Sequence, residues 1–256
     1  MFTDRTALRT AAYGDPGPLA ARLSIYRFQR DPVDLPGLAL TALAGVRGTV
    51  LDAGCGLGTY VDRLRSERPD LRVLPLDLSA GMRQEVVGDV QALPLADASV
   101  GGALAMHMLY HVPDIPAAIR ELRRVVEPGG VLVVSTNGSQ DKLEIGRLVS
   151  DAVHDLTGTT VEPPDADSRF TPDDAGLLRA EFGTVEVEVL ERETLVPEVE
   201  PVVAFVDSMR ALTGALVPAE VPWETFLGAV RARVAAEIER HGVWRLGNRV
   251  GVLTCH

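Results

Sequence analysis

Cysteine and long apolar runs are scarce in this sequence of 256 residues. The two cysteines, Cys55 and Cys255, lie far apart and form no CxxC pair, so we expect neither a disulfide framework nor a metal site. No stretch approaches the roughly 18 apolar residues of a membrane span, and residues 1–10 lack the apolar core of a signal peptide. These absences predict a cytoplasmic protein with no membrane partner.

Basic residues are also in deficit, with 25 Lys and Arg against 36 Asp and Glu and a net charge of −11. Binding a phosphate backbone requires clustered Lys and Arg, so we expect no nucleic-acid partner. The remaining composition is globular, because 46% of the residues are hydrophobic. A chain of this length can bury one large core, with or without an appended helical cap. Both a monomer and a homodimer stay open.

From Thr49 onward, short apolar stretches alternate with helical patterns, which is typical of a parallel sheet with crossover helices. We expect strands at 50–51, 71–76, 85–87, 98–106, 131–135, 185–189 and 249–254. In the sixth strand, valines at 185, 187 and 189 alternate with glutamates, which predicts one buried face and one face in water. The predicted fold class is α/β, a doubly wound, mostly parallel seven-stranded sheet with an antiparallel last strand and a helical cap.

Helical patterns lie before, between and after these strands. We expect them within 14–45, from 58 to 68, from 116 to a stop at 127–130, over 143–153 and from 171, with a loop at Pro163 and Pro164. About fifty residues separate the last two strands and carry two more helical patterns, at 202–212 and 223–240. An antiparallel pair needs only a short hairpin, so this excess is an insertion with a role of its own.

The most informative stretch joins the first strand to the helix after it. Gly54, Gly56 and Gly58 allow a tight turn and a close approach of ligand to backbone, because no Cβ blocks either. Their G-x-G-x-G spacing differs from the G-x-G-x-x-G of dinucleotide-binding turns. Asp52 lies inside the turn, where its carboxylate would repel a pyrophosphate and attract an ammonium group. The turn therefore favours a nucleotide-like ligand without phosphates.

A second acid, Asp77, follows the second strand, where a carboxylate can accept hydrogen bonds from both hydroxyls of a ribose. The glycine turn and the segments 77–82, 88–94, 106–112 and 122–130 resemble, in order, the motifs of class I S-adenosylmethionine-dependent methyltransferases. The resemblance covers about residues 48–136 and is strongest to the small-molecule, ubiquinone/menaquinone-type subgroup. It implies a Rossmann-like methyltransferase fold, S-adenosyl-L-methionine as cofactor and S-adenosyl-L-homocysteine as product.

The same resemblance assigns the cofactor contacts. They are Asp52, Gly54, Gly56, Gly58, Asp77, Leu78, Asp89, Val90 and Met106. Asp89 would accept the adenine amino group, the backbone N–H of Val90 would meet the ring, and Met106 would lie beside the sulfonium. Fewer residues separate Asp77 from Asp89 than the family usually has there. We therefore expect a stub in place of the helix after the second strand, and a short third strand.

His107, Tyr110 and His111 follow the fourth strand, where the resemblance places the acceptor. A histidine with a pKa near neutrality can take a proton from a hydroxyl group, so His107 and His111 are candidate general bases. For His111, which precedes a turn at Pro113, a structural role is at least as good an interpretation. Amine acceptors need no base, because the transfer is an in-line displacement in which positioning dominates.

We divide the chain into an N-terminal helical cap, 1–47, a Rossmann-like core, 48–199 and 245–256, and an insertion, 200–244, that forms part of an acceptor lid. The candidate substrate-binding residues are Tyr26, Arg30, Tyr110, Phe205, Met209, Trp223 and Phe226. They are apolar or amphipathic side chains suited to a pocket wall, and ordinary helix packing is an equal alternative for each member of the cap and the insertion.

The predicted function is transfer of a methyl group to an O, N or C atom of a small-molecule acceptor, with a secondary metabolite as the expected class. One alternative is a relative that binds S-adenosylmethionine in a non-methylating, cyclase-like or regulatory role. The other is an NAD-type oxidoreductase, which the glycine spacing and Asp52 disfavour. The acidity of the chain weakens the case for an RNA methyltransferase. The sequence does not name the acceptor.

Overall fold

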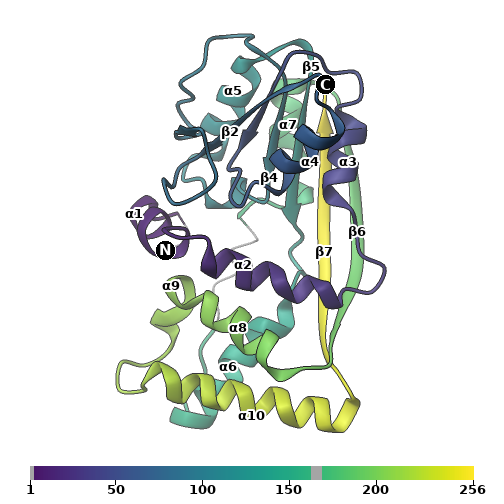
Figure 1. The fold of residues 1–256 in the computed structure, drawn as a ribbon. Coiled ribbons are helices and arrows are strands. Elements are labelled where there is room, and N and C mark those ends of the chain that lie inside the picture. The colour runs from purple at the N-terminus through teal and green to yellow at the C-terminus, as the bar shows by residue number, and fades with distance from the viewer. Residues whose placement is uncertain (1–2, 163–168) are drawn as a thin grey trace.

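The computed structural model describes residues 3–162 and 169–256 and centres on a seven-stranded sheet in the order β3-β2-β1-β4-β5-β7-β6 (Figure 1). The strands are β1 (Thr49–Ala53), β2 (Arg72–Asp77), β3 (Val86–Val87), β4 (Val100–Met106), β5 (Val126–Asn137), β6 (Val185–Val196) and β7 (Trp244–Cys255). β1 to β5 are parallel, and β7 pairs antiparallel with both β5 and β6. The predicted fold class is confirmed.

Helices cover both faces of the sheet. The helices α3 (Leu35–Ala42) and α4 (Thr59–Glu67) pack on one face, and α5 (Ile115–Val125) and α7 (Ala175–Phe182) on the other. An apolar core lies between the sheet and each pair of helices. Adjacent residues of a strand point to opposite faces, so Val50 of β1 lies in the core under α3 and α4, and Leu51 lies in the core under α5 and α7. The sheet is therefore buried on both sides, which explains the continuous apolar character of its central strands.

Local capping chemistry starts two helices where the sequence predicts them. The side chain of Asp114 accepts a hydrogen bond from the backbone N–H of Ala117 at 2.9 Å, which satisfies a free donor in the first turn of α5. Thr171 and Asp174 form a capping box around η5 (Pro172–Asp174), which leads into α7. The loop predicted at 163–164 lies outside the described residues.

A helical layer with its own apolar core lies at the far end of β6 and β7 (Figure 1). It consists of α2 (Gly17–Ser24), η2 (Ile25–Phe28), α6 (Leu143–Thr157), α8 (Val199–Ser208) and α10 (Trp223–His241). Trp244 and Leu246 at the start of β7 are buried in this layer, whereas Leu253 and Cys255 at its end are buried in the sheet core. β7 therefore ties the two cores together.

The described residues also form five short helical segments. They are α1 (Arg5–Ala7), η1 (Leu8–Ala12), η3 (Leu109–His111), α9 (Arg210–Thr213) and η6 (Gly214–Leu216). The first two run over the end of the sheet, and Leu8 and Ala12 of η1 pack against Leu212 of α9. This contact joins the N-terminal segment to the insertion between the last two strands.

Two local predictions are wrong. The fifth strand does not begin at 131, because α5 ends at Val125 and β5 begins at Val126 and passes through 127–130 with a register shift against β4. Gly129, with a φ of +82°, follows a proline without an N–H, and this pair produces the irregularity. Val187 and Val189 are not on a buried face but are 38% and 40% exposed, since β6 is the outermost strand of the sheet.

Candidate active site

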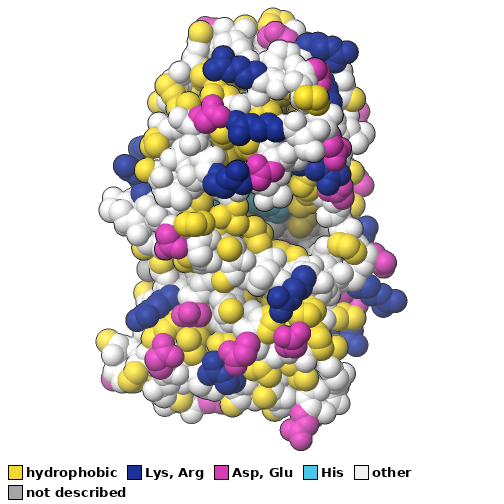
Figure 2. All heavy atoms as spheres, viewed as in Figure 1, with side chains coloured by type: hydrophobic (Ala, Val, Ile, Leu, Met, Phe, Trp, Pro, Cys, Tyr) yellow, Lys and Arg dark blue, Asp and Glu magenta, His cyan; other side chains and the backbone are white. Residues whose placement is uncertain are grey.

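A cavity of about 1000 Å³ lies beyond the carboxyl ends of β1, β2 and β4. Here β1 has β2 on one side and β4 on the other, so the chain order reverses, which is where open α/β sheets bind ligands. The opposite wall comes from the N-terminal segment, α6 and α8. Figure 2 shows the surface hollowed between the sheet and the helical layer. The volume is at the upper end of the usual range for ligand pockets, so two ligands can share it.

The glycine turn forms one wall of this cavity. Gly54, Gly56 and Gly58 have φ values of +75°, +50° and +77°, a conformation that only glycine adopts readily. A Cβ on Gly54 would lie 2.9 Å from the Cβ of Met108, and one on Gly56 would lie 3.2 Å from a methyl group of Leu19. Gly54 and Gly56 line the cavity, whereas Gly58 precedes α4 and lies outside the lining. Two of the three glycines therefore offer their backbone to a ligand.

Asp52 is buried behind the turn and does not itself line the cavity. Among the described residues, neither of its carboxylate oxygens has a hydrogen-bond partner. Burial, and then the negative charge of Asp77, raise the pKa of Asp52 to about 7. A nearby cation would stabilise such a carboxylate, so this end of the cavity favours a positively charged ligand group over a pyrophosphate.

Asp77 holds the glycine turn and faces the cavity. Its Oδ2 accepts a hydrogen bond from the backbone N–H of Gly56 at 3.0 Å, and its Oδ1 accepts one from Ser79 at 2.9 Å. Burial raises the pKa of Asp77, and the N–H groups of Ser79, Gly56 and Leu78 partly offset that rise. An ionised carboxylate has about four acceptor sites, so Asp77 can still accept hydroxyl groups of a ligand. Leu78 lines the cavity beside it.

Asp89 and Val90 also line the cavity, but the Asp89 carboxylate already has protein partners. Arg5 of α1 lies 2.6 Å from its Oδ2, and the backbone N–H of Gln91 donates to its Oδ1 at 3.0 Å. Sequence reasoning missed Arg5. The short spacing before Asp89 does produce a short third strand, with β3 at Val86–Val87 where 85–87 was predicted, and turns and bends instead of a helix follow β2.

Met106 ends β4, and the polar residues after it continue the cavity wall through His107 and Tyr110. His107 has a φ of +53°, which is uncommon for a residue with a side chain. Its backbone N–H donates to the carbonyl oxygen of Ser135 on β5 at 2.9 Å, which fixes the strand end. The geometry brings His107 to the ligand space, and its role as a base stays a prediction.

His111 lines the same cavity and contacts a residue that sequence reasoning missed. Its Nε2 is 2.9 Å from the hydroxyl oxygen of Tyr13, and the two rings meet edge to face. The Tyr13 hydroxyl in turn accepts a hydrogen bond from Arg22 at 3.3 Å. Tyr13 and His111 are 98 positions apart, so no local sequence pattern connects them. Proton transfer at Nε2 of His111 would therefore involve the Tyr13 hydroxyl.

The predicted acceptor residues divide into two groups. Those that line the cavity are Tyr26, Tyr110, Phe205 and Met209; those outside its lining are Arg30, Trp223 and Phe226. Trp223 and Phe226 stack on each other and pack into the helical core, because the apolar face of α10 contacts α6 and α8. The backbone N–H of Arg30 donates to Glu193 of β6 at 2.8 Å.

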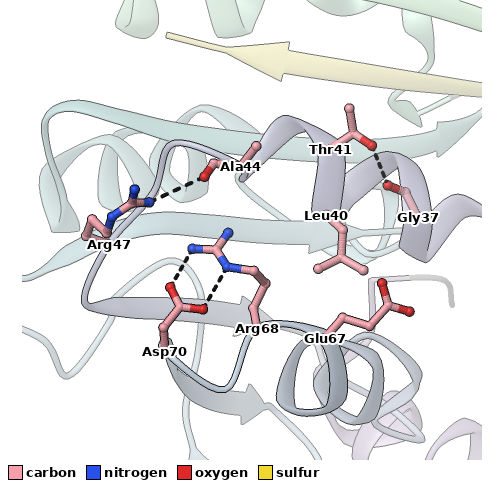
Figure 3. Close-up of a pocket in the computed structure, with 8 residues that line it drawn as sticks. All are labelled: Gly37, Leu40, Thr41, Ala44, Arg47, Glu67, Arg68 and Asp70. Carbon is pink, nitrogen blue, oxygen red and sulfur yellow. Dashed lines mark hydrogen bonds and ion pairs between the residues drawn. The ribbon is translucent and has the colours of Figure 1, made fainter.

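A second recess, of about 560 Å³, lies beside α3 and the end of α4 and is open to solvent (Figure 3). Arg68 at its floor forms two hydrogen bonds to Asp70, both of 2.8 Å. It also donates to the carbonyl oxygens of Leu43 and Val46, at 3.0 and 2.9 Å. These bonds tie the end of α4 to the end of α3, so Arg68 has a structural role.

Residues 3–162 and 169–256, the part of the chain that the structure describes, bear on two other kinds of site. Within those ranges, no three His, Cys, Asp or Glu side chains are grouped so that they could hold a metal ion. In the same ranges, no helix combines the length and the apolar character that crossing a membrane requires. Cys55 and Cys255 are buried free thiols.

Residues 51–134 match a protein family described as a methyltransferase domain. The malonyl-acyl-carrier-protein O-methyltransferase of Serratia marcescens is 39% identical over 107 residues, which are 38% of this chain and 41% of that protein. The enzyme of the same name from Dechloromonas aromatica is 34% identical over 149 residues, or 54% of this chain and 51% of that protein. The chain thus spans about half the length of these curated relatives, or less.

Solved structures resemble the chain over most of its length. One, described as a methyltransferase from an antibiotic biosynthesis pathway of Anabaena variabilis, has a TM-score of 0.58 at 21% identity and covers 87% of this chain and 96% of its own. Phosphoethanolamine N-methyltransferase 2 of Haemonchus contortus has a TM-score of 0.53 at 14% identity and covers 100% and 60%. At such identities the likeness establishes the Rossmann-like fold alone. Residues 51–134, which match the methyltransferase domain, form the part of this fold that carries most of β1, all of β2 to β4 and most of β5.

Proposed function

We propose that the chain is a methyltransferase that binds S-adenosylmethionine in this cavity and methylates an O, N or C atom of a small-molecule acceptor. The observation that carries the proposal is the way in which the Asp77 carboxylate is held at the cavity wall. Its two oxygens are fixed by the backbone of Gly56 and Ser79, yet the carboxylate still faces the cavity beside the glycine turn. This arrangement suits the two hydroxyls of a ribose held against a close-approaching backbone.

The residues around Asp77 fit the rest of the cofactor. The buried charge of Asp52 suits the ammonium end of the methionine moiety, and Asp89, shared with Arg5, suits the adenine amino group. Val90 and Met106 supply apolar surface at the same wall. When bound there, the cofactor would supply an electrophilic methyl group and leave as S-adenosylhomocysteine.

The opposite wall suits an acceptor with a sizeable apolar part. Tyr26, Phe205 and Met209 face the cavity from the N-terminal cap and from the insertion. We propose that 1–47 and 200–244 act as the cap of a core formed by 48–199 and 245–256. Displacement at a sulfonium is favoured in a closed site that excludes water and aligns the reactants. The acceptor is a small molecule, either free or carried on a protein as in the relatives named above.

The proposal replaces the oxidoreductase alternative, since the family model and the relatives named are methyltransferases. Calorimetric titration with S-adenosylhomocysteine and with NADH tests the cofactor, and we expect binding of the first alone. Incubation with methyl-labelled S-adenosylmethionine and a panel of small molecules that carry hydroxyl, amino or carboxyl groups then tests the transfer. Tight cofactor binding without label transfer to any acceptor would contradict methylation and favour a non-methylating role.

A further inference from the structure

Arg22 of α2 is a half-buried arginine on the cavity wall whose charge no described carboxylate balances. Its hydrogen bonds go to neutral oxygens: the Tyr13 hydroxyl at 3.3 Å and the carbonyls of Pro18 and Ala12, both at 3.5 Å. These are long bonds for a guanidinium, which forms its strong bonds to anions at about 2.7–2.9 Å. Its donors therefore have capacity for a better acceptor.

The other basic side chains along the cavity are in different situations. Arg5 is paired with Asp89, and Lys142 with Asp141. Arg192 donates to the carbonyl oxygens of Asp31 and Glu191 at 2.9 and 2.7 Å, and Arg147 is exposed to solvent. The chain has 36 acidic residues against 25 basic ones, so carboxylates are in excess. The Arg22 guanidinium lies 5.0 Å from the centre of the Tyr13 ring but has no carboxylate partner among the described residues, which indicates that its anionic partner comes from outside.

Arg22 lies where an acceptor would be held. Leu19, one helical turn earlier on α2, covers Gly56 of the cofactor turn, and residues three apart share a helix face. Through Tyr13, the Arg22 guanidinium connects to His111 at the end of η3. The cavity near α2 and α8 is otherwise apolar, with Tyr26, Phe205 and Met209 among its lining. One cationic group thus faces an apolar space next to the glycine turn.

We propose that Arg22, with the Tyr13 hydroxyl, binds a carboxylate on the acceptor, and that the acceptor is an apolar molecule bearing this single acidic group. The proposal rests on the proposed function for the position of the cofactor. A planar guanidinium matches a carboxylate with two parallel hydrogen bonds, and one guanidinium balances one negative charge. A phosphate dianion would require a second unpaired cation at the same place. Because a carboxylate is ionised at neutral pH, holding it requires no proton transfer to His111.

The test is calorimetric binding of octanoate, octanol and octyl phosphate to the full chain saturated with S-adenosylhomocysteine. We expect octanoate to bind at least ten-fold more tightly than octanol, and the Arg22→Gln variant to lose that preference. Arg22→Lys, which keeps the charge without the planar fork, should retain part of it. Arg9→Gln is the matched control, because Arg9 is an exposed arginine of the same N-terminal segment outside the cavity lining.

Each outcome has a defined meaning. An equal affinity of the wild-type chain for octanoate and octanol, a preference for octyl phosphate, or an unchanged preference in Arg22→Gln would overturn the proposal. S-adenosylhomocysteine affinity, measured for every variant, reports whether the cofactor wall is intact. If the wild-type chain binds no S-adenosylhomocysteine, the proposed function fails; if it binds it without preferring the carboxylate, only this inference fails.

Discussion

The cavity has two walls that are built in different ways. The core wall, formed by the glycine turn, Asp77 and Asp89, consists of backbone in special conformations and of acids fixed by neighbouring N–H groups. The opposite wall, called the cap wall here, is formed by the N-terminal segment and α8 together with α6 of the core, and it consists of side chains brought together from distant parts of the chain. We therefore expect the core wall to tolerate few changes and to hold the proposed cofactor, and we expect the cap wall to tolerate more changes and to select the acceptor.

The largest effect on cofactor affinity is expected from Gly56→Val. A β-branched residue at a φ of +50° is strained, and its Cβ would lie 3.2 Å from Leu19 in the space above the turn. With strain of about 1–3 kcal/mol and the loss of ligand space, affinity for S-adenosylhomocysteine should fall by at least about 100-fold in calorimetry. Gly228→Val, in an open position on α10, is the control and should bind normally. Normal binding by Gly56→Val would move the ligand elsewhere.

The next effect is expected from Asp77→Ala, which removes a charge-assisted acceptor from the core wall. The loss should be about 1.5–3 kcal/mol of cofactor binding free energy. Calorimetry measures it, and circular dichroism checks that the variant is folded. Glu188→Ala, which removes an exposed carboxylate from the edge strand, should leave affinity unchanged. Equal affinities for Asp77→Ala and the wild-type chain would remove Asp77 from the site.

A smaller, pH-dependent effect is expected from Asp52. Its pKa is raised to about 7, so the ionised form that attracts a ligand cation gains population between about pH 6 and about pH 7.5. S-adenosylhomocysteine affinity should rise several-fold over that range, and Asp52→Asn should flatten the profile. A profile with the same slope in Asp52→Asn would show that another group titrates.

The raised pKa of Asp52 also predicts that the stability of the ligand-free chain changes with pH in the opposite direction to the cofactor affinity. Because burial raises the Asp52 pKa above its ordinary value of 3.8, the folded state holds the proton more tightly than the unfolded state. The free energy of unfolding of the ligand-free chain should therefore fall as pH rises from about 4 to about 7 and level off above. Asp52→Asn should melt at a higher temperature than the wild-type chain at about pH 8, and this advantage should shrink near pH 5. A constant difference in melting temperature would contradict the assignment.

The smallest effect on cofactor affinity, and a clear one on the acceptor, is expected from Met209→Ala. Met209 is half-buried on the cap wall, so its loss should leave S-adenosylhomocysteine binding within about two-fold of the wild-type value. Acceptor turnover should fall, mainly through a higher KM. Ser208→Ala, next to it but outside the cavity lining, is the control. A large loss of cofactor affinity in Met209→Ala would show that the two walls are not separable.

The difference between the core wall and the cap wall also explains which parts of the site could be predicted from the sequence. The glycine turn, Asp77 and the short β3 follow from patterns within a few residues, because each depends on local backbone geometry. The contacts of Tyr13 with His111 and of Arg5 with Asp89 join residues far apart in the chain, and no periodicity encodes them.

The aromatic residues of the insertion show the same limit. Apolar spacing on α8 and α10 predicts helices correctly, but it does not say which residues face a cavity and which face a neighbouring helix. Phe205 lines the cavity, whereas Phe226 is 1% exposed within the helical core. Both have the same side chain, so only the packing of the two helices decides between them.

The claim that the core wall holds the cofactor is tested most directly by amide hydrogen exchange with and without S-adenosylhomocysteine. The backbone N–H groups of 54–58 and 77–79 lie in the turn and at Asp77, so their exchange should slow markedly on binding. Slower exchange in 5–22, which covers the cavity, would accompany it. Protection confined to 37–47 and 67–70, around the recess at Arg68, with no change in 54–58 and 77–79, would contradict the account.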